Sequence, residues 1–233
     1  MVRTVSILVA FVLSMLPGTA QSEDYDLSTE LSTDIPLALG ARVQFKERDS
    51  FRLSLGVGYL PKPYLGMING VAVAIASDQG YTDADADVVR QALANSLVVR
   101  IHGGWQLTRN LYIDAGYGFV GLGGGLTGED LLILATGFEG TFSGQEGNTY
   151  DVSCTLHMLD VEVGWEWDLE PWVMRAAVGA AFTLGSSTDI KPGADDSTFT
   201  QALITFSENY LNDLFTSYVH SPTLSFSAGY RFF

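Results

Sequence analysis

Residues at alternate positions differ in character along most of this chain, and the segment 222–233 shows the pattern clearly. One set of positions holds Leu224, Phe226, Ala228, Tyr230 and Phe232, whereas the set between them holds Ser225, Ser227, Gly229 and Arg231. A repeat of two residues is the period of a β-strand, because successive side chains point to opposite faces of a sheet. The segment is therefore predicted to be a strand with one apolar face.

Eight segments follow this alternation, namely 24–31, 36–46, 51–60, 97–107, 111–121, 156–167, 172–184 and 222–233. Tight turns are expected at 47–50, 108–110 and 168–171, and excursions of more than thirty residues at 61–96, 122–155 and 185–221. Short and long connections alternate, which places the tight turns at one end and the long loops at the other. The sequence predicts an all-β fold, an eight-stranded antiparallel up-and-down barrel that forms one domain over 21–233.

Each long excursion contains a segment with a helical pattern. At 83–96, acidic residues occupy a predicted first turn, where the helix dipole stabilises negative charge. At 128–138, Thr127 is a candidate N-cap, with Asp130 three residues later. At 197–216, one stripe of the helix would carry Phe199, Leu203, Phe206, Tyr210, Leu214 and Phe215. Three long, partly helical loops are therefore expected.

The face opposite the large apolar residues carries glycine, alanine, serine and isolated charges on every strong segment. A soluble ligand-binding barrel has apolar residues inside and polar residues in water, whereas glycine suits the narrow interior of an eight-stranded barrel. We therefore expect the glycine-rich face inside and lipid outside. The charged residues expected in the lumen are Arg42, Arg52, Arg100, His102, Asp114, Asp160, Glu162, Glu166, Arg175 and Arg231.

Pairing the strands across the turn 108–110 is consistent with this orientation. With Leu107 opposite Leu111, the inward His102 and Asp114 each face a glycine. A large side chain and a glycine then share the same level of a narrow lumen.

A second register is expected across the turn 168–171. With Trp167 opposite Trp172, Arg175 lies diagonal to Glu162 and Glu166, within reach of long side chains. The hypothesis is that Arg175 stabilises the barrel by offsetting both carboxylates.

Large aromatic residues flank the tight turns on the outward face. The set is Phe45, Phe51, Trp105, Trp165, Trp167, Trp172 and Phe232. Aromatic rings gathered at one end of the strands are typical of a membrane interface, whereas the core of a soluble sandwich would scatter them along the strands. The terminal aromatics would anchor the last strand as it closes the barrel against the first.

The first twenty residues have the layout of a secretory signal peptide. Arg3 precedes an apolar run over 6–16, which Pro17 ends, and Ala20 marks the expected cleavage site. The apolar run is too short to span a bilayer as a helix. Residues 1–20 are therefore expected to direct export and to be removed.

Charge and cysteine content limit the classes of function. The chain has 27 acidic and 12 basic residues, a net charge of −15 at pH 7, which argues against nucleic acid as a partner. Cys154 is the single cysteine, so an intramolecular disulfide is excluded, and a small buried residue is expected there.

Together, the export signal, the eight alternating segments, the asymmetric connections and the aromatic terminus resemble the small bacterial outer-membrane β-barrels, the OmpA-type and OmpX-like group. The resemblance covers the whole mature chain as architecture and rests on no residue-specific motif. In that group the final Phe is in phase with the outward aromatics, a phase held here by Phe232. The resemblance implies residence in the bacterial outer membrane, with the long loops at the cell surface.

An enzyme hypothesis rests on His157, because some small outer-membrane barrels resemble lipid A-modifying hydrolases and acyltransferases. The expected register places Phe182 opposite His157, and Ser153 lies too far along an extended strand to serve as a nucleophile. An interfacial histidine without catalytic function is the preferred interpretation.

Two short motifs resemble ligand-binding loops but lack residues that such loops require. The string "DADAD" at 83–87 lacks the glycine and glutamate of a calcium loop, and "GLGGG" at 121–125 lacks the lysine of a phosphate loop. They are interpreted as an acidic helix start and a flexible strand exit. No catalytic residue, metal site or cofactor is expected.

The preferred function is that of a non-enzymatic barrel that displays acidic loops at the cell surface in a structural, interaction or adhesion role. The expected partners are outer-membrane lipid and lipopolysaccharide, reached through divalent cations that carboxylates bind, or a cationic surface partner. The alternative is a narrow channel, or a conduit for hydrophobic ligands with the segment 128–138 at its mouth. The lumen charges favour a plugged interior over this alternative.

Overall fold

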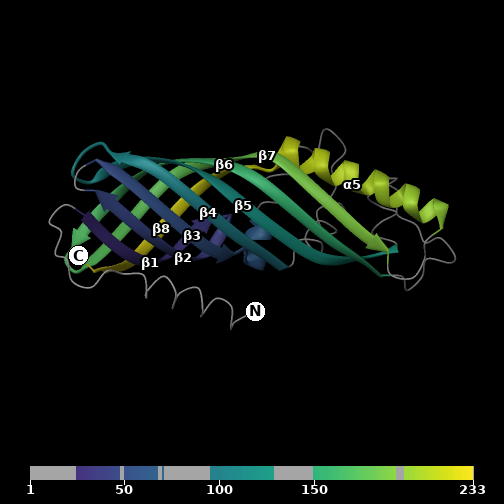
Figure 1. Cartoon of the computed structure of the whole chain (residues 1–233), viewed down its shortest axis with the longest axis horizontal. Coiled ribbons are helices and arrows are strands. Elements are labelled where there is room, and N and C mark those ends of the chain that lie inside the picture. The colour runs from purple at the N-terminus through teal and green to yellow at the C-terminus, as the bar shows by residue number, and fades with distance from the viewer. Residues whose placement is uncertain are drawn as a thin grey trace.

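The structure is a computed structural model that describes residues 25–47, 50–67, 70, 95–128, 149–192 and 197–232. Eight antiparallel strands form a closed barrel in sequential order. They are β1 (Tyr25–Ile35), β2 (Ala38–Glu47), β3 (Phe51–Tyr59), β4 (Asn95–Gln106), β5 (Leu111–Thr127), β6 (Thr149–Leu169), β7 (Trp172–Pro192) and β8 (His220–Arg231). Figure 1 shows the strands running obliquely around the long axis of the barrel. The predicted fold class and strand number are confirmed.

Closure of the barrel depends on the first and last strands. β8 pairs with β1 from Ser28 opposite Arg231 to Ile35 opposite Leu224. The Phe232 amide continues the ladder by donating to the Leu27 carbonyl at 2.9 Å. The terminal strand therefore leaves no free edge, as the sequence predicted.

Three strands are much longer than expected. β5, β6 and β7 contain 17, 21 and 21 residues, so they extend into the expected excursions 122–155 and 185–221. The glycine-rich segment 121–125 is part of β5 and not a flexible exit. The expected strand ends were wrong because the outward apolar residues stop at those positions, although the hydrogen-bonded pairing of the strands continues with a different pattern of side chains.

Helix α5 (Thr198–Tyr218) confirms the helix expected at 197–216, and the side chain of Ser197 caps it by accepting from the Thr200 amide. In Figure 1 the helix lies alongside the extended end of β7. Within the expected stripe, Leu214 and Phe215 are buried and Leu203 and Tyr210 are partly buried, whereas Phe199 and Phe206 are exposed. The buried face also includes Thr200, Ile204, Ser207 and Leu211. The helices in the described part of the chain are too short or too polar to cross a membrane.

The other two expected helices fall almost entirely outside the described residues. Of the segment 83–96, only 95–96 are described, and they begin β4. Of the segment 128–138, only residue 128 is described. The expected signal peptide, residues 1–20, also lies outside and stays a prediction.

The two expected registers had different outcomes. Across β4 and β5, His102 lies opposite Gly116 and Gly104 opposite Asp114, as predicted. Across β6 and β7 the prediction was wrong by two residues, because Leu169 and not Trp167 lies opposite Trp172. The sequence places an outward tryptophan on each side of this turn and so does not decide the register. The observed register has a shorter turn than the expected one.

Candidate functional site

Ion pairs fill the interior of the barrel. The basic side chains are Arg42, Lys46, Arg52, Arg100, Arg175 and Arg231, and the buried acidic ones in contact with them are Glu30, Asp34, Asp114, Asp160, Glu162 and Glu166, while Arg231 also pairs with the more exposed Asp26 and Asp168. The lumen therefore holds equal numbers of basic and buried acidic side chains, and their charges balance. We call these residues, with His102, the lumen charge network.

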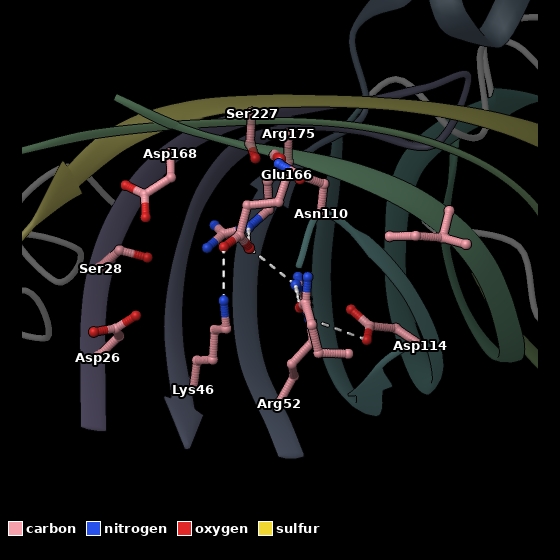
Figure 2. Close-up of polar contacts among 12 residues, drawn as sticks. Asp26, Ser28, Lys46, Arg52, Asn110, Asp114, Glu166, Asp168, Arg175 and Ser227 are labelled. Atoms are coloured by element: carbon pink, nitrogen blue, oxygen red, sulfur yellow. Dashed lines mark hydrogen bonds and ion pairs between the residues drawn. The ribbon is translucent and has the colours of Figure 1, made fainter. Parts of the chain in front are cut away.

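Glu166 is the centre of the half of the network nearer the tight turns. Its carboxylate lies 3.0 Å from Lys46, 2.9 Å from Arg52 and 2.8 Å from Arg175, all measured between nitrogen and oxygen. Figure 2 shows Lys46 and Arg52 reaching Glu166 from neighbouring strands. Arg231 lies within 3.8 Å of Glu166 and is the most exposed of these cations, since it sits at the rim and also binds the half-exposed Asp168. One buried carboxylate thus contacts four cations on four strands.

The other half of the network lies toward the long loops. Arg100 pairs with Asp34 at 2.7 Å and with Asp160 at 3.0 Å, while Arg42 approaches Asp34 at 3.4 Å and Glu162 at 3.7 Å. The His102 ring lies opposite Gly116, where even a Cβ atom would come within 2.0 Å of it. The glycine therefore provides the volume that the ring occupies.

The expected pairing of Arg175 was partly wrong. Arg175 lies directly opposite Glu166, and its second partner is Glu30 on β1, not Glu162. Glu162 instead lies opposite Gly179 and accepts from Ser225 at 3.4 Å. The two-residue error in register accounts for the difference.

Sequence reasoning missed Glu30, Asp34 and Lys46 as members of the network. The signal is present in the sequence, because Glu30 falls on the face of segment 24–31 opposite Tyr25 and Leu27, and Lys46 falls on the same face of segment 36–46 as Arg42. Extending the first of these alternations to residue 34 would have found Asp34.

A small cavity lies in the described part of the lumen. The cavity, of about 10 Å³, near the volume that one water molecule requires, lies among Asp34, Arg42, Arg100 and His102. The side chains that line it are held by ion pairs from several strands. The described part of this interior is therefore a polar core held together by ion pairs.

The seven expected girdle residues all lie on the outside of the barrel and are exposed. Ten residues separate Trp167 from His157 along β6, and the outward residues between them are Leu159, Val161, Val163 and Trp165. Ten residues span about 33 Å along a strand. At a tilt of about 40° this projects to about 25 Å, the height of the apolar band of a membrane barrel.

Both faces of the long strands change polarity beyond His157. Outward, Leu159 and Trp165 give way to Thr155, Ser153 and Asp151. Inward, the buried charges give way to buried apolar residues of β4 to β7, namely Val98, Val120, Leu122, Leu126, Val152, Cys154, Leu156, Met158 and Ile190. A membrane protein exposes apolar side chains to lipid and a water-exposed domain buries them, so this level marks the edge of the bilayer.

Helix α5 packs on the apolar interior of the extended strands. Ile204, Leu211, Leu214 and Phe215 belong to the same buried cluster as Leu156. Asn212 accepts from Thr188 at 2.9 Å and from Ser186 at 3.0 Å, which fixes the helix against β7. We call this unit, formed by the ends of β5 to β7 and α5, the loop-side core.

His157 lies on the outer face at the edge of the apolar band, and its surroundings differ from the expectation. It lies opposite Gly185 and not Phe182, because the register of β6 and β7 differs by two residues from the expected one and a bulge in β7 at this level adds a third. Across β5, its Nδ1 shares a hydrogen bond with the hydroxyl of Tyr117, a neighbour that the sequence interpretation overlooked. Phe119, directly opposite His157 on β5, makes an edge contact with the ring, with centroids 5.8 Å apart.

Metal binding finds no support within the described ranges, where no group of three or more His, Cys, Asp or Glu side chains is placed to hold an ion. The acidic segment 83–87 lies outside those ranges. Together, the closed barrel, the apolar band and the girdle make this a transmembrane β-barrel of the outer-membrane type.

No protein-family model matches the chain, and a search of curated proteins finds no match either. Among solved structures, the chain is similar to a major outer membrane protein from Thermus thermophilus, with 12% identity, a TM-score of 0.46 and coverage of 89% of this chain and 99% of that one. It is also similar to CarO from Acinetobacter baumannii, with 12% identity, a TM-score of 0.40 and coverage of 88% and 96%. CarO2 from the same organism gives 11% identity, a TM-score of 0.39 and coverage of 89% and 98%.

Proposed function

We propose that this outer-membrane-type barrel is a non-enzymatic scaffold of the bacterial outer membrane that presents the loop-side core at the cell surface. The observation that carries the proposal is the lumen charge network beneath an apolar core. Charges that bridge several strands hold the wall rigid, and the core lies where the lumen would open toward the loops. A rigid membrane anchor with a structured outer end is suited to display and contact rather than to transport.

Conductance in planar bilayers tests the plugged lumen. We expect purified barrel to show no stable open steps, because ions would have to displace buried Arg–carboxylate pairs. Protease protection of the same protein in vesicles controls for insertion. Large, reproducible steps from inserted protein would contradict the proposal and favour the channel.

Orientation is tested by labelling single cysteines on whole cells with a membrane-impermeant maleimide. Asp189→Cys on the loop side should be labelled on intact cells, whereas Arg109→Cys in a tight turn should be labelled only after the outer membrane is permeabilised. The parent chain is the blank, because burial raises the pKa of the Cys154 thiol to about 11. The opposite pattern would reverse the topology.

We further propose that the acidic loops contact lipopolysaccharide through divalent cations. Most of the acidic loop residues lie in 71–94 and 129–148, outside the described ranges, so the support is the charge of the sequence. Chelation should then accelerate proteolysis of the loops on whole cells while the strands survive. Equal cleavage rates with and without chelator would contradict cation bridging and leave a cationic protein partner as the alternative.

A conduit for hydrophobic ligands is the second candidate, and the apolar residues that line the loop-side core favour it. A hydrophobic dye should bind in the loop-side core, and a hydrophobic ligand should displace it. Leu156→Asp should abolish binding of the dye. Absence of saturable dye binding would leave the scaffold as the better function.

A further inference from the structure

A polar cluster lies on the outer surface of the barrel at the edge of the apolar band, and it is formed by His157 of β6 and its neighbours on β5 and β7. Tyr117 and Phe119 hold the His157 ring from the β5 side, by the hydrogen bond to Nδ1 and by an edge contact. When the Tyr117 hydroxyl is the donor, the neutral imidazole carries its proton on Nε2. The ring then offers a positioned N–H donor at the edge of the apolar band.

Space for a ligand is left on the β7 side of the ring. The bulge places Gly185 opposite His157, and a Cβ atom added to Gly185 would meet nothing within 4 Å. The next cross-strand pair outward is Thr155 with Ser187, which adds two hydroxyl groups just beyond the ring. A β-bulge that re-aims a strand beside an open position is a common feature of functional sites.

The level of the cluster identifies its ligand. His157 lies about 25 Å above the tryptophans of the tight-turn end, where lipid headgroups begin. Below it, Leu159 and Phe182 form an adjacent exposed apolar pair, which suits an acyl chain. A phosphate group accepts hydrogen bonds from imidazole and hydroxyl donors, and its negative charge strengthens them.

We infer that His157, Tyr117 and the gap at Gly185 form a binding site for the phosphate of a lipid headgroup in the leaflet on the loop side. Tyr117 is a positioning residue that fixes the ring, and His157 is the donor to the phosphate. The acyl chains lie along the apolar wall of β6 and β7. The inference rests on the barrel spanning the membrane, but it concerns binding and requires no reaction.

The test is a titration of the folded full chain in dodecyl maltoside, a detergent without phosphate. The probe is dihexanoyl phosphatidic acid, and the readout is the NMR signal of 13C-labelled histidine rings. We expect a saturable shift of the His157 signal. Dihexanoylglycerol, which has the same chains without phosphate, and inorganic phosphate, which has no chains, should each bind at least about tenfold more weakly, since one charge-assisted hydrogen bond contributes about that factor.

Variants separate this site from general adsorption, with isothermal titration calorimetry of the same lipid as the readout because it does not depend on a signal from His157. His157→Phe keeps a flat ring without the donor and should weaken binding about tenfold, and Gly185→Leu should do the same by filling the gap. His220→Phe is the matched control, because His220 is also outward and contacts Phe182 but has no tyrosine partner among the described contacts. It should bind as the parent does.

Three results would overturn the inference. These are equal affinity of parent and His157→Phe, equal binding of dihexanoylglycerol, and equal binding of inorganic phosphate. Folding of each variant is checked by its heat-dependent gel mobility, and Tyr117→Phe provides a second test should Gly185→Leu not fold. Because the titration is done in detergent, its outcome is independent of where cell fractionation places the protein.

Discussion

The guanidinium of Arg175 contacts the carboxylate of Glu30 inside the barrel, although 145 residues separate them in sequence. Arg175 belongs to β7 and Glu30 to β1, and β8 lies between the two strands. Ser227 of β8 donates to the second carboxylate oxygen of Glu30 at 2.6 Å. This contact therefore links the three strands at which the two ends of the chain meet.

Replacing Arg175 should destabilise the closed barrel. Arg175→Met leaves Glu30 and Glu166 buried with fewer cations, and removing one partner of a buried charge cluster typically costs about 3–5 kcal/mol. The free energy of unfolding, measured by urea titration in lipid vesicles, should fall by that amount. Adding Glu30→Gln to the same chain should restore part of the loss.

The matched control is Lys191→Met. Lys191 pairs with Asp189 at 3.4 Å on the exposed end of β7, where both side chains are in water. An exposed pair contributes at most about 1 kcal/mol. Similar losses for Arg175→Met and Lys191→Met would mean that the buried contact does not stabilise the seam.

A methyl group at Gly116 should prevent correct packing of the lumen. Its Cβ atom would lie 2.0 Å from the His102 ring and 2.4 Å from the Ile101 carbonyl, which belongs to the backbone and cannot move aside. Gly116→Ala should reduce the folded fraction recovered from urea. Gly125→Ala, farther along the same strand, has only an ordinary contact at 3.8 Å and should refold as the parent does. Equal yields would contradict the register of β4 and β5.

The apolar band is tested by Val161→Arg. Val161 is outward and 38% exposed near the middle of the band. A charge facing the bilayer midplane costs about 2–4 kcal/mol, whereas an exposed arginine on a soluble barrel costs almost nothing. Ser153→Arg lies on the same face of β6 beyond His157 and should be neutral. Equal unfolding free energies for the two variants in vesicles would place the bilayer edge elsewhere.

The loop-side core should be separable from the barrel. Val152 is buried beneath α5, and Val152→Asp places an unpaired carboxylate in an apolar cluster. Limited proteolysis should then cut α5 rapidly while the heat-dependent gel mobility of the barrel is retained. Ser153→Asp, one residue along on the exposed face, should leave α5 protected. Loss of the barrel itself in Val152→Asp would show that the two parts fold as one unit.

By itself, the sequence determined the strand number, the inward phase of the charges and the outward phase of the aromatics. These follow from a period of two residues, which each strand expresses locally and which lipid enforces on the outside. The β4–β5 register was also accessible, because each large inward side chain required a glycine opposite it. The helix at 197–216 was accessible through its periodicity.

Only the tertiary structure decided which charges meet. Glu30 and Arg175 come together because closure brings β1 beside β8, and their distance depends on the register and stagger of strands that are remote in sequence. The sequence did not reveal the lengths of β5 to β7, because the two faces of these strands exchange polarity at the level of His157. Below that level the apolar residues face lipid, and beyond it they face the interior of a water-exposed domain, so the strands continue where the lipid-facing pattern ends. The Tyr117–His157 pair likewise depends on which residues two strands place side by side, which alternation along either strand does not encode.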